Sequence, residues 1–348
     1  MFNPVVEGLR AVGALMVLVH HYVFYLTPVW AERLLGLHFF HVGVDLFFVL
    51  TGYLFAPLLL GFHTQTIKVF VRRRIWRLYP MYLISLILAL FLSAGDLGED
   101  LFQLLRHLLF LQAAPDQNLA DVGYFSEVYW TLTVEVAFYV LIALSLKLPH
   151  SWLSSSQRFW WLAVIAMVGF ITLYSFQYAP SNKDWVVRQA QLPALLIEFW
   201  FGMAVFWLLK QSGDHYKHYY PLFLGFGLVI LVALYWYYPT ALAESISPRP
   251  FGWFNVLAAF GFALLLAGIL LAQQKGLLLP KSWGQMAVKA GAGSYGIYLL
   301  HDFIAQLVFL WAMPPNISVV TALLLTLCTS VLLYKWVEAP CREYGRSK

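Results

Sequence analysis

The sequence predicts an all-α protein, a polytopic transmembrane helix bundle of about ten spans with no soluble domain. Of its 348 residues, 61% are hydrophobic and only 11% are charged, whereas a soluble domain carries about 25% charged residues. Stretches of roughly 20 mostly apolar residues, the length that crosses a bilayer, recur along almost the whole chain. A soluble fold of this composition would lack the polar surface needed to cover its core.

Apolar runs separated by proline, glycine and charged residues define the expected spans in chain order. These runs cover residues 5–26, 42–61, 75–93, 125–146, 159–177, 190–209, 220–238, 253–272, 292–312 and 316–336. A shorter apolar segment, 101–113, holds Arg106 and His107, and we expect an interfacial or re-entrant helix there. Because the sequence has no repeat and no low-complexity linker, residues 1–348 are expected to form a single membrane domain.

Neither a leader sequence nor a cysteine pattern indicates what the protein does. The first apolar segment lacks a basic leader region and carries Glu7, Arg10 and two histidines, so we interpret it as a retained span and not a signal peptide. Cys328 and Cys341 form neither a disulfide framework nor a metal-binding spacing. We therefore expect no metal site and no bound cofactor.

The distribution of lysine and arginine predicts the topology, because cytoplasmic loops carry an excess of both. With a cytoplasmic N-terminus, the inside receives the basic connection between spans two and three and the C-terminal tail, whose residues are Lys68, Arg72, Arg73, Arg74, Arg77, Arg342, Arg346 and Lys348. The acidic connection 94–124 then lies outside. Both termini are therefore expected to be cytoplasmic.

Several ionisable side chains fall inside the predicted spans, where they are costly and usually face the bundle interior. They are Arg10, His21, Asp45, Glu135, Glu198, His301 and Asp302. For any one of these groups, a structural pair between helices is as good an explanation as a functional site. Their complementary types and similar depth favour a shared site for the set.

The first span is the most informative. Arg10 and His21 are 11 residues apart, which puts them on one helix face about 16 Å apart along the axis. Glu7 shares that face, whereas His20 points about 80° away and is expected to pack against other helices. His21 is therefore the better active-site candidate.

Other charged groups are expected at related depths. Asp45 enters span two near the level of His21, where a carboxylate could orient the imidazole. Glu135 and His301 lie about mid-span, and a histidine with a nearby carboxylate suits proton transfer from a hydroxyl. A proton or ion relay of the transporter kind is the alternative.

A basic cluster precedes the third span. Arg74 and Arg77 are spaced to share a helix face, and the planar guanidinium fork suits phosphate. The plainer alternative is topology, since basic residues just inside a span commonly contact lipid headgroups.

Seven short motifs occur in order along the chain. They are Glu7-Gly8-Leu9-Arg10-Ala11 with His21-Tyr22, the segment 43–54, the segment 73–80, the segment 129–135 with Phe138-Tyr139, the segment 192–203, the segment 294–301, and Glu338-Ala339-Pro340. Together they resemble the membrane-bound acyltransferase-3 family. Glu7, Thr51 and Thr131 stand where that family usually has Asp, Ser and Ser, so the acid and the hydroxyls are retained.

The resemblance implies an O-acyltransferase with ten helices in the bacterial cytoplasmic (inner) membrane. It implies transfer of an acyl group, commonly acetyl from acetyl-CoA, to a hydroxyl of an envelope glycan, a lipid-linked glycan or another carbohydrate. Membrane lipid is then a partner and nucleic acid is not. Some members carry an extra esterase-like domain, which we expect this chain to lack because it ends soon after span ten.

With the substrate class implied by the resemblance, helix geometry suggests a role for each candidate residue. The catalytic group is His21, Asp45, Glu135 and Arg10. The acyl-CoA group is Arg73, Arg74, Arg77 and Tyr79, with Arg72 able to assist. The supporting group is Trp130, Glu198, Ser294, Tyr298 and His301. Direct transfer and an acyl-enzyme on Thr51 or Ser294 both remain open. A polytopic transporter using the buried charges as a relay is the alternative function, and an inactive scaffold is a third.

Overall fold

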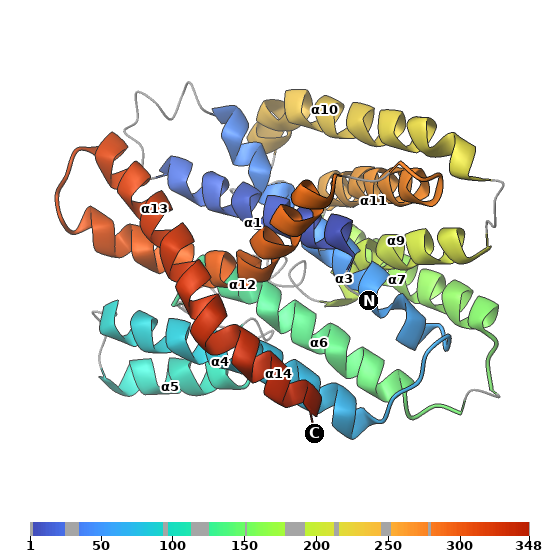
Figure 1. Cartoon of the computed structure of the whole chain (residues 1–348), viewed down its shortest axis with the longest axis horizontal. Coiled ribbons are helices and arrows are strands. Elements are labelled where there is room, and N and C mark those ends of the chain that lie inside the picture. The colour runs from blue at the N-terminus through green and yellow to red at the C-terminus, as the bar shows by residue number, and fades with distance from the viewer. Residues whose placement is uncertain are drawn as a thin grey trace.

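The computed structural model of the chain describes residues 3–24, 35–92, 97–112, 125–149, 152–177, 192–211, 216–244, 252–277 and 280–347. All regular elements of these residues are helices, as Figure 1 shows. The predicted all-α class is therefore confirmed for this part of the chain.

The helices of the first half are α1 (Pro4–Phe24), the 3₁₀ helix η1 (Leu35–Val42), α3 (Gly43–Leu59), α4 (Ile67–Leu92), α5 (Leu97–Leu108), the short 3₁₀ turn η2 (Glu127–Tyr129), α6 (Trp130–Ser145) and α7 (Ser155–Gln177). Those of the second half are α9 (Leu192–Gln211), the 3₁₀ turn η3 (Tyr216–Tyr219), α10 (Tyr220–Glu244), α11 (Trp253–Gln274), α12 (Lys281–Phe309), α13 (Pro315–Leu333), the π-helical segment η4 (Tyr334–Glu338) and α14 (Ala339–Ser347). Each predicted span overlaps one of these helices, with different bounds in several cases.

Six described helical stretches are long and apolar enough to cross a membrane. They are Gly36–Leu59, Ile67–Leu92, Leu192–Gln211, Tyr216–Thr240, Trp253–Gln274 and Pro315–Ser347. The chain is thus a multi-pass membrane protein. Helices α1, α6, α7 and α12 cover the other predicted spans, and the count of about ten stays a prediction.

The bundle is held by a few close helix pairs. Helix α1 packs on α12 and α3, α3 packs on α9, and α10 packs on α11. A Cβ on Gly52 would overlap the carbonyl of Phe199, and a Cβ on Gly202 would overlap that of Val49. Small residues let membrane helices approach until their backbones touch, so these two glycines set the spacing of α3 and α9.

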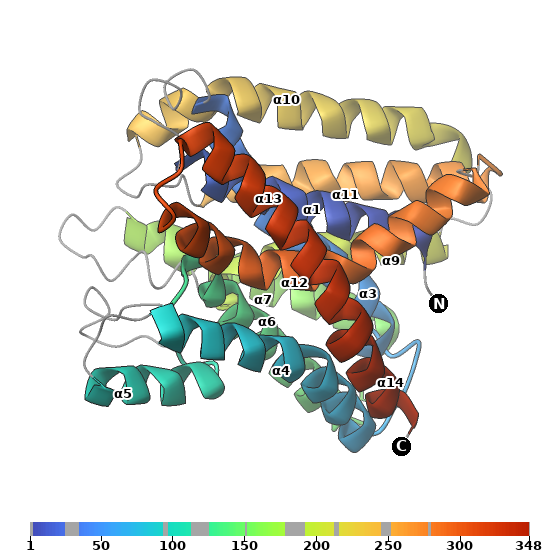
Figure 2. The same ribbon diagram turned by 60° about the vertical axis from the view of Figure 1, so that its left-hand side comes forward.

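The start of α1 and the end of α14 lie on the same side of the bundle in Figure 2, and α14 ends beside the start of α4. The C-terminal helix α14 packs on α4 there. Helix α5 lies alongside α4, where Tyr79 and Tyr82 donate hydrogen bonds to the carbonyls of Leu108 (2.8 Å) and His107 (3.0 Å). The interfacial or re-entrant placement of this segment stays a prediction.

Candidate active site

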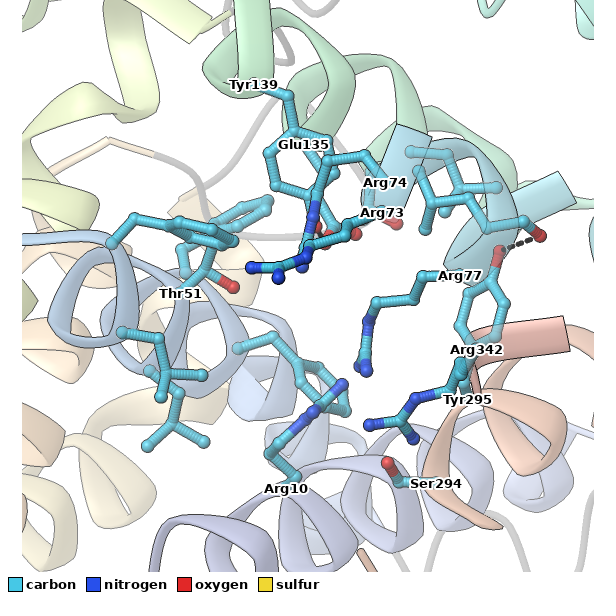
Figure 3. A pocket seen from close by; sticks show the side chains of 18 of the residues that line it. Arg10, Thr51, Arg73, Arg74, Arg77, Glu135, Tyr139, Ser294, Tyr295 and Arg342 are labelled. Carbon is cyan, nitrogen blue, oxygen red and sulfur yellow. Dashed lines mark hydrogen bonds between the residues drawn. The ribbon is translucent and has the colours of Figure 1, made fainter. Parts of the chain in front are cut away.

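Side chains from α1, α3, α4, α6, α12 and α14 enclose a cavity of about 580 Å³. Figure 3 shows many of its lining side chains directed inward. Its main feature is a set of six arginines, Arg10, Arg73, Arg74, Arg77, Arg342 and Arg346. Among the described residues, Glu7 and Glu135 are the only acids in its lining, so the cavity is strongly cationic and suits an anionic ligand.

The first half of α4 supplies three of these arginines. Arg73 and Arg74 precede Arg77 by four and three residues, and such spacings bring side chains onto one helix face. The Arg72 side chain projects from α4 towards α14, where its Nε donates to the carbonyl of Gly345 at 3.1 Å. Arg72 therefore holds α14 and is not among the cavity residues, in contrast to the assisting role expected for it.

Aromatic rings hold Arg74 in position. Its Cζ lies 5.0 Å from the ring centroid of Phe55 and 5.5 Å from that of Tyr139, distances at which a ring face attracts a cation. The buried Nε of Arg74 makes no hydrogen bond with the described residues. Since buried donors normally have a partner, this nitrogen is a suitable donor to an oxygen of a bound anion.

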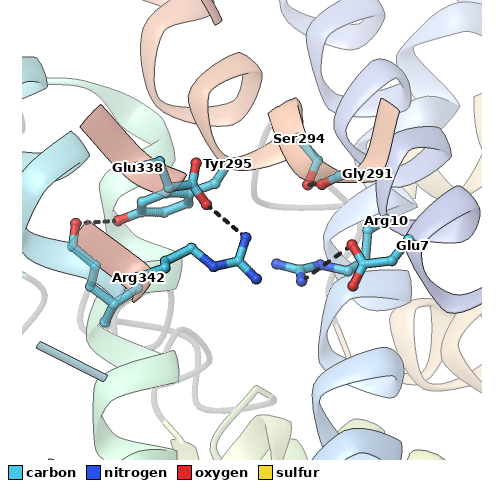
Figure 4. A network of polar contacts seen from close by, with 8 residues as sticks. Glu7, Arg10, Gly291, Ser294, Tyr295, Glu338 and Arg342 are labelled. Carbon is cyan, nitrogen blue, oxygen red and sulfur yellow. Dashed lines mark hydrogen bonds and ion pairs between the residues drawn. The ribbon is translucent and has the colours of Figure 1, made fainter. Parts of the chain in front are cut away.

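Two ion pairs face each other across the cavity, as Figure 4 shows. Arg10 Nη1 lies 3.9 Å from Glu7 Oε2, and Arg342 Nη1 lies 3.3 Å from Glu338 Oε1. Glu135 accepts a hydrogen bond from Tyr139. These carboxylates fix the directions of the cations and leave the arginines in excess.

One wall of the cavity is formed by Thr131 and Tyr298, which we call the hydroxyl wall. Their oxygens are 2.7 Å apart, and the Tyr298 hydroxyl donates to the carbonyl of Val128 at 3.1 Å. The Tyr298 ring lies 5.7 Å from the ring of Phe47 and 6.3 Å from that of His301, measured between centroids. The wall therefore stands between the arginines and His301.

Beyond the hydroxyl wall, His21 of α1 lies against His301 of α12, with ring centroids 4.9 Å apart. Their Nδ1 atoms donate to the carbonyls of Val17 (2.9 Å) and Ile297 (3.0 Å). Because a carbonyl only accepts, each Nδ1 carries hydrogen and each neutral ring has its lone pair on Nε2. Both imidazoles are buried, and neither lines the cavity.

The His20 ring packs against His21 and, on other sides, against His38 and His41. In the described part of the chain, no group of three or more His, Cys, Asp or Glu is arranged to hold a metal ion. His20 Nδ1 donates to the carbonyl of His38 at 2.8 Å. This contact agrees with the packing role expected for His20.

Asp45 is not beside His21, contrary to the expectation that it orients the imidazole. Both of its oxygens accept from Asn255 Nδ2, at 2.9 and 3.1 Å, and Glu198 lies against it. Asp45 points to the same side of α3 as Gly52, towards α9, whereas Thr51 faces the cavity. Depth along a helix was therefore the wrong guide to its partner.

The remaining predicted residues divide between the cavity and its surroundings. Ser294 lines the cavity, and its hydroxyl donates to the carbonyl of Gly291 at 2.7 Å. Tyr79 donates a hydrogen bond to α5 as described above and is not among the lining residues, so its predicted role in binding acyl-CoA stays a prediction. Trp130 begins α6 next to Thr131, outside the lining.

Sequence reasoning did not assign several polar lining residues to the site, among them His63, Gln65, Tyr139, Tyr295, Arg342 and Arg346. Two of them carried a usable signal. Tyr139 follows Glu135 by four residues and Arg342 follows Glu338 by four, the spacing at which helical side chains meet. Arg342 was interpreted only as part of a topological tail.

The fold and this site define a multi-pass membrane protein with a cationic cavity next to a buried histidine pair. Comparison with known proteins then identifies its family. A family profile described as an acyltransferase domain matches residues 3–335. The chain therefore belongs to this acyltransferase family.

Similar proteins include the O-acetyltransferase OatA of Staphylococcus aureus strains NCTC 8325 / PS 47 and COL. Each is 24% identical over 386 residues, which cover 99% of this chain and 58% of the relative. The chain thus spans about three fifths of the length of the curated relatives it matches. No solved structure matches the chain.

Proposed function

We propose that this protein is an integral-membrane O-acyltransferase of the bacterial inner membrane. It takes an acyl group, acetyl in the simplest case, from cytoplasmic acyl-CoA and transfers it to a hydroxyl of an envelope glycan or another carbohydrate. The observation that carries the proposal is the cavity with six inward arginines in a chain of the acyltransferase family.

The donor's phosphates fit the chemistry of this cavity. Arg73, Arg74 and Arg77 share one face of α4, and guanidinium groups bind phosphate oxygens in pairs. The Nε of Arg74 offers a buried donor with no described partner. A transporter of neutral solutes would not need this concentration of cations, so the cavity favours the enzyme over the relay.

His21 serves as the general base in this proposal. The carbonyl of Val17 accepts the Nδ1 hydrogen, so the lone pair of the neutral ring is on Nε2, the atom that would take a proton from the acceptor hydroxyl. The acceptor oxygen then attacks the thioester carbonyl carbon, and the carbon–sulfur bond breaks. The proton passes from His21 to the departing sulfur, so CoA leaves as a thiol.

The arginine end and the histidine end are connected by α1. Arg10 lies in the cavity, and His21 lies about 16 Å further along the helix axis. The pantetheine arm of the donor bridges a distance of this order. Its thioester reaches His21 only after the hydroxyl wall opens, because Tyr298 stands between the cavity and the histidine pair.

An acyl-enzyme route is less favoured by the local hydrogen bonds. The Ser294 hydroxyl donates to the carbonyl of Gly291 within its own helix. In that orientation its proton is directed at a backbone carbonyl, which is not a base able to remove it, whereas a covalent nucleophile needs such a base. Direct transfer assisted by His21 is therefore the proposed route.

The decisive experiment replaces His21 with glutamine in the purified full chain and follows transfer from radiolabelled acetyl-CoA to envelope glycan. The transfer rate is expected to fall about 100-fold or more, while acetyl-CoA affinity stays unchanged because His21 lies outside the cavity. Full transfer activity in H21Q would disprove the role of His21. If wild-type protein moved solute without cleaving acetyl-CoA, the transporter would replace the enzyme.

His107 provides a matched control. It is buried and its Nδ1 bonds the carbonyl four residues earlier, Gln103, at 2.7 Å, as in His21. Burial lowers the pKa of His107 to about 4, so it is neutral near pH 7. His107→Gln should leave transfer intact because α5 lies outside the cavity.

A further inference from the structure

The C-terminal helix α14 is joined to α13 by an unusually wide turn. The N–H of Ala339 bonds the carbonyl of Tyr334, five residues earlier, in the π-helical segment Tyr334–Glu338. Pro340 follows directly, and a proline inside a helix lacks the N–H and clashes with the carbonyl four residues before it. The wider turn accommodates Pro340 without ending the helix, and such single π-turns are frequent at functional sites.

Helix α14 is fixed against the arginine-bearing part of α4. Arg72 bonds the carbonyl of Gly345, and the rings of Trp76 and Tyr344 meet edge to face with centroids 4.7 Å apart. A Cβ on Gly345 would lie 2.7 Å from the Cβ of Trp76, so the close approach needs glycine there. These contacts determine which side of α14 faces the cavity.

The side that faces the cavity carries Arg342 and Arg346. The Arg342 side chain is 12% exposed, and its partner Glu338 is 2% exposed. Figure 4 shows the Arg342 guanidinium directed at that of Arg10. Glu338 thus holds Arg342 so that its head group points into the cavity from the side opposite α1.

Three guanidinium groups, those of Arg10, Arg77 and Arg342, therefore converge, and their like charges oppose one another. Two of them have an ion-pair partner of their own, Glu7 or Glu338. Like charges brought together away from water repel strongly. An anion bound among the three would relieve this repulsion, and phosphate suits the planar donors.

We infer that α14 is part of the donor site, with Arg342 binding a phosphate of the acyl donor together with Arg10 and Arg77. Glu338 is a positioning residue that acts through Arg342. The inference rests on the proposed function, in which the cavity takes acyl-CoA. It adds a binding group from the end of the chain to the arginines of α4.

The test is equilibrium binding of acetyl-CoA to the purified full chain for wild type, Arg342→Ala, Arg342→Lys and Lys335→Ala. Lys335 lies in the same segment, is exposed and does not line the cavity. R342A should raise the Kd about 10-fold or more, because a charge-assisted hydrogen bond is lost. The Kd of R342K should lie between those of wild type and R342A, because lysine keeps the positive charge but lacks the planar guanidinium group. The Kd of K335A should stay within about twofold of the wild-type value.

A salt titration separates binding from a merely structural role. If Arg342 contacts a phosphate, the Kd of R342A should depend less steeply on salt than that of wild type. An equal Kd for R342A and K335A would overturn the inference, as would a weaker Kd with unchanged salt dependence and a lowered Tm. If R342A fails to fold, Arg342→Gln replaces it, because glutamine removes the charge while keeping much of the side-chain length, and the same two readouts decide.

The two proposals fail in distinguishable ways. If wild-type protein binds acetyl-CoA and R342A binds it equally, only the role of α14 is overturned. If wild-type protein does not bind acetyl-CoA, the proposed donor is wrong and the role of Arg342 is rejected with it.

Discussion

Buried charge occurs in two regions of this protein that differ in what it faces. In the arginine-lined cavity, the guanidinium groups of Arg10, Arg77 and Arg342 face about 580 Å³ of open volume. Between α3, α9 and α11, Asp45 and Glu198 face each other and Asn255, and none of the three lines that cavity. A buried charge thus indicates a binding site when it faces open volume, and a structural contact when it faces only other side chains.

The largest effect on acetyl-CoA binding is expected when cations are removed from the cavity, which tests the difference between the two regions most directly. Arg74→Ala combined with Arg77→Ala should raise the Kd for acetyl-CoA about 100-fold or more, because two charge-assisted contacts are lost. Equilibrium binding measures the change. Arg106→Ala removes a cation outside the cavity and should have little effect. Unchanged CoA affinity in the double variant would leave only the topological interpretation of the cluster.

A substitution at the contact between α3 and α9 should lower the stability of the fold and leave the Kd for acetyl-CoA unchanged. Gly52→Ala should lower the free energy of unfolding by about 1–3 kcal/mol, because a Cβ there overlaps the Phe199 carbonyl. Gly225→Ala is the control, since a Cβ at Gly225 has nothing within 4 Å. Thermal unfolding in detergent measures both. Equal Tm values for the two variants would contradict the tight contact between α3 and α9.

The smallest effect is expected for Asp45→Asn. Asparagine keeps the shape and can still bond Asn255, and Asp45 does not line the cavity, so the Kd for acetyl-CoA should stay within about twofold. The transfer rate should fall far less than in His21→Gln. A loss equal to that of H21Q, with an unchanged Tm, would return Asp45 to the catalytic group.

The sequence predicted much of the fold because apolar runs report helices directly. The errors at helix ends have local causes. Helix α12 begins at Lys281 and not near residue 292, since its first turns hold Lys, Gln and Gly and are not continuously apolar. Helix α4 begins at Ile67, because its arginines face a cavity and need no apolar surroundings.

The site was predicted in part, for a geometric reason. Arg10, Arg74, Arg77 and Glu135 line one cavity as expected, since spacing along each helix gives the shared face. Which neighbour a face meets depends on packing between distant segments. Asp45 shares a helix face with Gly52, so that glycine was the available sign that Asp45 turns towards another helix.

The hydroxyl wall bears on whether anions could cross the membrane through the cavity. A bundle that gathers anions with six arginines would conduct them down the membrane potential if its cavity were continuous from face to face. Thr131 and Tyr298, whose hydroxyl oxygens lie 2.7 Å apart, line the cavity, whereas His21 and His301 lie outside it. On the proposed function, a cavity that stops short of the histidine pair would hold an anionic donor without conducting it across the membrane.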